Sequence, residues 1–414
     1  MFDLLVHNAQ LLSVEDGRLT PNAWIRVSDG RIHSTGTGLD WGQLSAGTHF
    51  IDAEGGTLVP GFIDAHVHLL ATSLDQLERD TWTPGYAMIR SLELAHRMLR
   101  RGFTTVRDVG GADHGLARVL DEGRLPGPRL LHGGYMISQT GGHGDLRPRS
   151  QAGDCHCAEI SGVAVIVDGV AQMQKTVREQ LRQGASHIKL AVSGGVASPH
   201  DEISAVQYSE EEIRAAVVEA ENANSYVTVH AYHPRAIAQA IRAGVHCVEH
   251  GNLLDADTAR QMAEKDIFLV PTLVTYELLA SQGATAGLEA SSVGKVATVR
   301  DYGLAAFKLA YESGVPIAFG TDLLGPMEAA QLGEFQIRSQ IVPPLEVIRQ
   351  ATVYAARLLR MEGQLGTLGE GAIADILVLD GNPQEDISIL LEPEKYLKYV
   401  IQAGKITATP ALDG

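Results

Sequence analysis

Cysteine is scarce in this sequence, with only three residues in a chain of 414. Three cysteines cannot build a disulfide framework, which excludes a small disulfide-stapled domain. Two of them stand in Cys155-His156-Cys157, but no second Cys or His pair accompanies them at zinc-binding spacing. We therefore interpret this segment as an ordinary polar loop and not as a zinc site.

Basic charge and long apolar runs are also lacking. Lys and Arg number 33 against 50 Asp and Glu, which gives a formal net charge of -17, and no basic cluster stands out. This balance argues against a nucleic-acid or anionic-membrane partner. No apolar segment approaches the roughly 18 residues that a membrane span needs, and residues 1–7 lack the basic region of a signal peptide. We expect a soluble, cytoplasmic protein.

What is present is an ordinary globular composition, with 45% apolar and 20% charged residues. The length suits one large barrel with a satellite domain, or two to three ordinary domains. Residues 1–58 are predicted to form short strands separated by turns such as Asp29-Gly30, and the same pattern of strands and turns returns after residue 374. Neither set makes a convincing sheet alone. We expect both ends, 1–58 and 363–414, to form one small β-sandwich domain.

Between the two ends, in residues 59–362, short apolar runs alternate with helical patterns. Eight runs are rich in β-forming residues: 58–68, 104–109, 129–135, 187–192, 226–230, 245–250, 267–273 and 315–322. Helical patterns separate most of them: 87–101, 170–183, 209–222, 234–243, 256–265 and 296–313. The helix at 209–222 begins with the capping-box pattern Ser209-Glu210-Glu211-Glu212. Eight strand–helix units predict an α/β fold with a (β/α)8 TIM barrel.

The functional interpretation starts from the motif His66-Val67-His68 at the end of the first apolar run. Alternate side chains of a strand point to the same face, so His66 and His68 project side by side. In a barrel the chemistry lies at the C-terminal ends of the strands. Those ends carry imidazoles, a lysine and a carboxylate: His66, His68, Lys189, His230, His250 and Asp322. Each alone has an ordinary alternative, such as a barrel histidine or a helix cap, but together they predict a divalent-metal site.

Lys189 needs a separate explanation because an ammonium donates hydrogen bonds and cannot bind a cation. Inside a cationic site its pKa would be lowered. A neutral amine can react with CO₂ to give a carbamate, whose two oxygens can bridge two metal ions. A neutral or salt-bridged lysine is the alternative, and the spacing of the residues leaves both open.

These residues together resemble the amidohydrolase superfamily over essentially the whole chain, and most closely its prolidase-like metal-dependent dipeptidases and carboxypeptidases, the group that includes ochratoxin-hydrolysing amidases. The motifs that carry the closer similarity are Thr140-Gly141-Gly142-His143-Gly144-Asp145, Ile188-Lys189-Leu190-Ala191-Val192-Ser193-Gly194-Gly195, His230-Ala231-Tyr232 and Val248-Glu249-His250-Gly251. The resemblance implies two zinc ions bridged by carboxylated Lys189 and a hydroxide. It also implies roles for His143 and Tyr232 near the substrate carbonyl, a small-molecule amide or dipeptide substrate, and a homo-oligomer, with an octamer as one form.

The ligand set also predicts a mechanism. A metal-bound water has a pKa of about 7 and supplies hydroxide at neutral pH. Asp322 takes the proton as the hydroxide attacks and passes it to the leaving amine. A metal ion polarises the carbonyl, and His143 or Tyr232 donates to the developing oxyanion.

Several residues near the predicted site have weaker functional interpretations. His233 and Arg235 are candidates to meet a substrate carboxylate, although a solvated helix start is favoured. His200 and Asp201 are candidate pocket residues with equally little support. We expect Gly194-Gly195 to let the backbone pass close to the site, since no phosphate-binding Gly-Lys-Ser/Thr follows.

Our leading hypothesis is a hydrolase of an amide bond to a C-terminal amino acid, in a dipeptide or an N-acyl amino acid, with ochratoxin-like amides among the candidate substrates. A cyclic-amide or imide hydrolase, or a deaminase, on the same scaffold is the alternative. Lys189 counts against mononuclear deaminases, which do not need a bridging lysine. A catalytically dead barrel is disfavoured because all six ligand positions are intact.

Overall fold

The computed structural model describes residues 3–73, 76–79, 81–147, 149–151, 163–198, 201–283, 288 and 290–410. The segment Cys155-His156-Cys157 and the candidate pocket residue His200 lie outside the described residues. Within these ranges no helix is both long and apolar enough to cross a bilayer.

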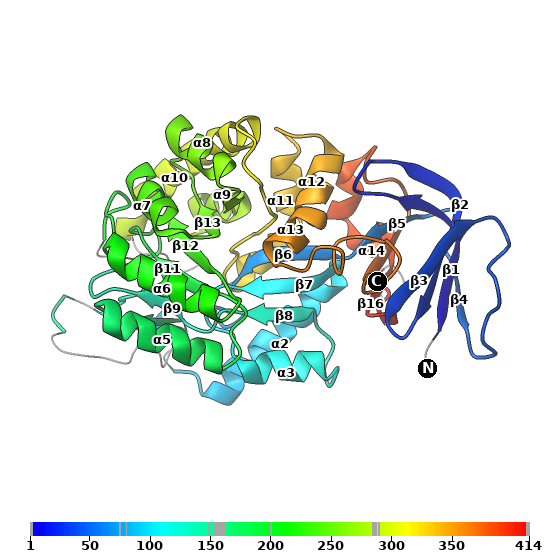
Figure 1. The fold of residues 1–414 in the computed structure, drawn as a ribbon, viewed down its shortest axis with the longest axis horizontal. Helices are drawn as coiled ribbons and strands as arrows, with labels where there is room; N and C mark the ends of the chain where they lie inside the picture. Colours follow the sequence, from blue (N-terminus) through cyan, green and yellow to red (C-terminus); the bar gives the residue numbers. More distant parts are fainter. Residues whose placement is uncertain are drawn as a thin grey trace.

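Strands from both ends of the chain form one sheet, drawn in blue and in orange to red on the right of Figure 1. Its strands are β1 (Leu4–Leu12), β2 (Leu19–Ser28), β3 (Arg31–Thr37), β4 (His49–Asp52), β5 (Thr57–Pro60), β15 (Ile376–Leu379), β16 (Leu397–Gln402) and β17 (Lys405–Ala408). Their order is β17-β16-β15-β5-β1-β2-β3, with β4 pairing beside β1. The predicted turn between β2 and β3 has φ of 51° at Asp29 and 75° at Gly30, as a tight hairpin requires. Because the pairing describes a single sheet, the β-sandwich and the domain boundaries stay predictions.

The rest of the chain alternates strands and helices, which confirms the predicted α/β class. Every pairing among its strands is parallel, in two sheets of order β6-β7-β8 and β10-β9-β11-β12-β13-β14. The strands are β6 (Phe62–Val67), β7 (Phe103–Asp108), β8 (Arg129–His132), β9 (Met136–Ser138), β10 (Ala164–Ile166), β11 (Ile188–Ala191), β12 (Val227–Ala231), β13 (Cys247–His250) and β14 (Phe268–Val270). They are buried at nearly every position, as expected for parallel strands covered by helices.

Helices follow most of these strands and cover the sheets (Figure 1). They are α1 (Gln76–Arg79), α2 (Pro84–Arg100), α3 (His114–Asp121), α5 (Val170–Arg182), α6 (Glu210–Asn222), α7 (Pro234–Ala243), α8 (Ala256–Glu264), α9 (Leu273–Gln282), α10 (Ala290–Glu312), α11 (Gly333–Arg338), α12 (Pro344–Gln350), α13 (Val353–Leu358) and α14 (Pro393–Tyr396), with 3-10 turns η1 (Gly325–Ala330) and η2 (Ile387–Leu391). The capping box predicted before α6 is present, since Ser209 Oγ accepts from Glu212 N at 3.3 Å and the Glu212 carboxylate accepts from Ser209 N at 2.8 Å.

Hydrogen bonds also connect the edges of the two parallel sheets. Ser186 N donates to His132 O at 2.8 Å, which joins the end of β8 to the chain entering β11. Ala318 N donates to Leu269 O at 3.0 Å, and Ala65 N donates to Phe319 O at 2.8 Å. Residues 315–322 therefore lie between β14 and β6.

Two strand predictions are corrected by the structure. Residues 315–322 form only an isolated bridge at Ile317, because Ile63 N and Phe319 N donate instead to Ala351 O and Gln350 O, at 2.8 and 2.9 Å. The run at 267–273 ends early, since Thr272 has a left-handed φ of 30° and α9 begins at Leu273.

A third correction concerns the run at 58–68, which is two strands and not one. Gly61 separates β5, in the terminal sheet, from β6, in the parallel sheet, and its N–H donates to Asp375 O at 2.9 Å. A Cβ at this position would lie 2.2 Å from Thr104 Oγ1, so only glycine fits without a shift of β7. The break carries the chain directly from the terminal sheet to β6, the strand that contains His66.

Candidate metal centre

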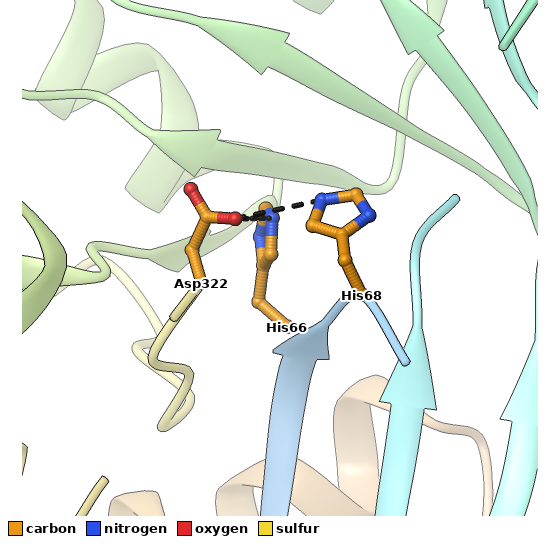
Figure 2. Close-up of side chains that lie close together, drawn as sticks. All are labelled: His66, His68 and Asp322. Carbon is orange, nitrogen blue, oxygen red and sulfur yellow. Dashed lines mark ion pairs between the residues drawn. The ribbon is translucent and has the colours of Figure 1, made fainter. Parts of the chain in front are cut away.

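Two histidines and one carboxylate meet at the carboxyl end of β6. His66 Nε2 lies 3.3 Å and His68 Nε2 3.5 Å from the same oxygen, Oδ1 of Asp322 (Figure 2). One ligand atom from each residue lies within 4.8 Å of the others. Asp322 is held there by its own N–H, which donates to His66 O at 2.8 Å. Imidazole nitrogens and a carboxylate oxygen that converge in this way suit a divalent metal ion.

Both histidines have their other ring nitrogen occupied. His68 Nδ1 lies 2.8 Å from Gly110 O, and a carbonyl oxygen can only accept, so Nδ1 carries the hydrogen. His66 Nδ1 lies 2.7 Å from Glu249 Oε2. When the rings are neutral, Nε2 is thereby the lone-pair nitrogen of each, facing Asp322. Burial lowers the pKa of His66, but the carboxylates of Asp322 and Glu249 outweigh it and raise the pKa, so a metal ion would take the place of a proton on Nε2. This arrangement matches the way that protein-bound metals have their histidine ligands oriented.

Glu249 belongs to a buried cluster of its own. Its Oε1 accepts from Arg107 NH2 at 2.6 Å and from the Thr228 hydroxyl, and the Glu249 and Arg107 side chains are fully buried. Burial alone would raise the pKa of Glu249, but the charges of Arg107, Lys189 and His66 outweigh it and hold the pKa well below its ordinary value. Glu249 is therefore an ionised acceptor that fixes the ring of His66.

The other predicted histidines complete a row of rings. Ring centroids lie 4.9 Å apart for His66 and His250, 4.6 Å for His250 and His230, and 4.2 Å for His230 and His143. His250 Nδ1 is 2.8 Å from Thr272 Oγ1. Burial lowers the pKa values of His230 and His250 well below the ordinary value, and this keeps both rings in the neutral state that metal binding needs.

The backbone is unusual where these side chains are presented. His250 and Asp322 have left-handed φ angles of 72° and 53°, a conformation that few non-glycine residues adopt. Gly320 also permits a close approach, because a Cβ there would lie 2.3 Å from Val270 Cγ1 and 2.9 Å from His66 Cβ. Strained residues persist only where the surroundings hold them, which is common at functional sites.

Lys189 lies in β11 with only 1% of its surface exposed, and its Nζ has no hydrogen-bond partner among the described residues. Burial lowers the pKa of Lys189 to about 8. The charge of Lys189 is also among the causes that shift the pKa values of His230, His250 and Asp322, so it acts on all three. A buried amine without a partner, beside neutral imidazoles and a carboxylate, fits a position that a metal-bridging carbamate would fill.

Tyr232 and His143 lie against this row of histidines. The Tyr232 ring is 4.8 Å from that of His230 and 5.3 Å from that of His250, and its hydroxyl is 2.9 Å from the Tyr276 hydroxyl. Burial raises the pKa of Tyr232, so its hydroxyl stays protonated and can donate. His143 is stacked on His230 with an interplanar angle of 15°.

Of the remaining candidates from the sequence, some lie at a helix start and others contact residues near the site. His233 is the N-cap of α7, where its side chain accepts from Arg235 N at 3.3 Å, and Arg235 is exposed, so both belong to a solvated helix start. Asp201 is buried and connects to His143 through Ser198. Gly195 does bring the backbone close, since a Cβ there would lie 2.1 Å from His143 Nδ1.

Sequence reasoning missed the residues that orient the ligands. These are Glu249, Arg107, Thr228, Thr272, Tyr276 and Ser198. The one available signal was that Glu249 directly precedes His250, which places an ionisable residue in a fully buried strand.

Parallel strands that bring imidazoles and a carboxylate together at their carboxyl ends are typical of α/β enzymes with a site that can hold a metal ion. The chain belongs to the amidohydrolase family: the sequence profile of the Amidohydrolase family matches residues 57–407. The ochratoxinase of Aspergillus niger is 32% identical over 98% of this chain and 86% of its own length.

Solved structures agree with this assignment. A prolidase complexed with N-methylphosphonate-L-proline is 44% identical, with a TM-score of 0.95 over 98% of this chain and 100% of its own. A Xaa-Pro dipeptidase with bound methionine in the active site is 29% identical, with a TM-score of 0.88 over 98% of this chain and 99% of its own. The expected family is confirmed, and the chain is a hydrolase that acts on carbon–nitrogen amide bonds.

Proposed function

We propose that this chain is a binuclear metal hydrolase that cleaves the amide bond to a C-terminal amino acid, in a dipeptide or an N-acyl amino acid. The observation that carries the proposal is the buried amine of Lys189, which has no hydrogen-bond partner in the described part of the chain and whose charge acts on His230, His250 and Asp322. A single His-His-Asp site would not need this lysine, whereas a pair of metal ions would need a bridge between them.

The geometry supports the following set of metal-holding residues. His66, His68 and Asp322 would hold one ion, His230 and His250 a second, and Lys189, carboxylated, would lie between the two. We also propose that eight segments close into a barrel, with residues 315–322 as the last: β6, β7, β8, β11, β12, β13, β14 and 315–322. The hydrogen bonds at both edges of the two sheets support this closure.

When bound, the metal pair would supply an activated water and polarise the scissile carbonyl. The protein's own groups then move and stabilise charge. Asp322 accepts a proton from the attacking water and passes it to the leaving nitrogen, a transfer that its contacts with His66 and His68 orient. Tyr232, protonated and adjacent to His250, donates a hydrogen bond to the carbonyl oxygen as negative charge develops there.

The substrate class rests on the relatives. One similar structure is a prolidase with a proline phosphonate, another is a Xaa-Pro dipeptidase, and a third relative is an ochratoxinase. Dipeptides that end in proline are therefore the first substrates to test, and N-acyl amino acids the second.

The test combines metal analysis with a hydrolysis panel of dipeptides, N-acyl amino acids and a cyclic imide. We expect about two metal ions per chain, because the candidate ligands form two groups that carboxylated Lys189 would bridge. We also expect turnover of the open-chain amides. His66→Ala with His68→Ala should lower both metal content and turnover. Wild-type metal and activity in that double variant would overturn the site. Turnover of only the cyclic imide would overturn the substrate class.

The bridge has a separate test. Lys189→Ala should be nearly inactive, and a short carboxylic acid in the buffer should restore part of the activity by replacing the carbamate. Electron density that ends in a plain amine at full metal occupancy would contradict the bridge.

A further inference from the structure

His143 ends a chain of hydrogen bonds that starts at the buried carboxylate of Asp201. The Ser198 hydroxyl is hydrogen-bonded to Asp201 Oδ1 and lies 3.2 Å from Gly195 O and 3.1 Å from His143 Nδ1. A carboxylate and a carbonyl oxygen only accept hydrogen bonds, and an acceptor oxygen at hydrogen-bond distance from a hydroxyl oxygen needs a hydrogen between the two. The single hydroxyl hydrogen of Ser198 therefore points at one of these oxygens and not at His143. Ser198 Oγ therefore faces His143 with a lone pair, and Nδ1 of His143 must carry the hydrogen.

The contacts of Gln207 independently identify Asp201 as a hydrogen-bond acceptor. Its Oε1 accepts from the backbone N–H of His143 at 3.0 Å, which settles the orientation of the amide. Its Nε2 then donates to Asp201 Oδ2 at 2.9 Å, and Gly195 N also points at this oxygen, at 3.3 Å. Asp201 thus receives donors on both oxygens, as an ionised carboxylate does.

Lys295, from α10, clamps the loop that carries this chain. Its ammonium donates to Ser198 O at 2.8 Å and to Asp201 O, and lies 3.4 Å from Gly195 O. Three carbonyls on one ammonium fix the backbone on both sides of Ser198. On the other face, the ring of His143 is stacked 4.2 Å from that of His230. The imidazole is therefore fixed in both position and rotation.

We propose that Ser198 and Asp201 are positioning residues that hold His143 in its Nδ1–H tautomer, so that Nε2 presents a lone pair to the substrate. The neutral ring then accepts a hydrogen bond, from the attacking water or from an N–H or O–H of the substrate, and does not donate one to the carbonyl oxygen. The two residues first considered as oxyanion donors thus have different tasks: Tyr232 donates and His143 accepts. The catalytic meaning of this assignment rests on the proposed function, but the tautomer itself does not.

The tautomer can be measured directly in the full-length, metal-free protein by NMR with ring-15N-labelled histidine at mildly alkaline pH. His143→Gln identifies the signal by its loss. We expect His143 in the Nδ1–H form, and Ser198→Ala should move it toward the Nε2–H form because the acceptor is gone. Ser281→Ala, which removes a hydroxyl bonded only to carbonyls of its own helix, should leave it unchanged. An Nε2–H ring in the wild type, or no change in Ser198→Ala, overturns the proposal.

A double-mutant cycle gives the kinetic counterpart. Ser198→Ala should lower kcat about ten- to a hundredfold with little change in KM, as for other residues that orient a functional group. In a His143→Gln background the same change should cost almost nothing, because the residue it orients is absent. Equal losses in both backgrounds would assign Ser198 to loop structure and overturn the proposal. An Nδ1–H ring in a protein without amidase activity would support the tautomer and overturn the proposed function instead.

Discussion

Asp322 is the carboxylate toward which three imidazoles converge, from His66, His68 and, at 3.9 Å, His250. Asp322→Asn keeps its shape and one carbonyl oxygen but removes the proton acceptor. We expect kcat/KM to fall by about 10² to 10⁴ because a general base is lost, and metal content to fall much less. Steady-state kinetics with metal analysis of the same sample tests this. Complete loss of metal would make Asp322 chiefly a ligand, and full activity would remove it from the mechanism.

Glu249 offers a second test at the scale of single residues. Glu249→Gln removes the charge that holds His66 Nδ1 and balances Arg107. We expect metal affinity to fall about 10- to 100-fold, as for other partners of metal-bound histidines. We also expect the protein to lose on the order of 3–5 kcal/mol of stability, because a buried guanidinium is left unpaired.

A matched control for Glu249→Gln exists in the same chain. Glu334 and Arg338 form another fully buried pair, at 2.7 Å. Their other hydrogen bonds go to Val274 N, Ala318 O and Gln350 Oε1, none of which is a candidate metal ligand. Glu334→Gln should therefore destabilise the protein without weakening metal binding, as measured by denaturant unfolding and by competition with a chelator. Equal loss of metal affinity in both variants would mean that Glu249 acts through stability alone.

The clustering of His66, His68 and Asp322 was predictable from the sequence, and the residues that orient them were not. His66, His68 and Asp322 are residue types with few other uses at strand ends, so residue type and position together indicate a metal. Ser198 or Thr228 are ordinary residues whose importance depends on a single neighbour far along the chain. Such pairs leave no periodic pattern, so only the folded structure reveals them.

Among the elements, the junction of β5 and β6 is the most constrained. The Cβ of Gly61→Ala would meet the side chain of Thr104, a stiff residue in β7, at 2.2 Å. We expect a loss of about 1–3 kcal/mol in the free energy of unfolding, the usual cost of overpacking. Gly47→Ala, where nothing lies within 4 Å, should be close to neutral. Denaturation midpoints of the two variants decide the matter, and equal midpoints would contradict the constraint.

The same junction shows why the elements were predicted only in part. Residues 57–60 and 62–67 are buried at every position, so no alternation of burial marks where one strand ends and the next begins. Helices such as α6 and α7 were predictable because a cap and an amphipathic face mark them. The reduction of residues 315–322 to an isolated bridge was not predictable. Phe319 N, and Ile63 N on the neighbouring strand β6, donate to Gln350 O and Ala351 O at the end of α12.

The stability of the whole molecule should fall in acid through His246. Burial, with Arg360 and Arg107, lowers the pKa of His246 to about 4. Between the ordinary pKa of about 6.5 and this value, the unfolded chain binds a proton that the folded chain does not. Stability is therefore fully present above pH 6.5 and is lost as the pH falls toward 4, by roughly 3 kcal/mol for this one group.

The comparison of wild type with His246→Phe isolates this contribution from that of other acid-sensitive groups. Urea unfolding at about pH 7 and about pH 4.5 should show a smaller acid loss in the variant, because its ring cannot be protonated. Parallel curves for the two proteins would show that His246 titrates alike in the folded and unfolded states.

The sheet shared by both ends of the chain has a consequence for synthesis. Arg31 in β3 donates to the carbonyl of Gly371, 340 residues later, and β5 pairs directly with β15. At about 5–20 residues per second, the first strands leave the ribosome on the order of 20–60 s before these partners exist. During that interval the nascent chain exposes the edge of β5, which is open to pairing with another copy. Once β15 is synthesised, it pairs with β5 and covers this exposed edge.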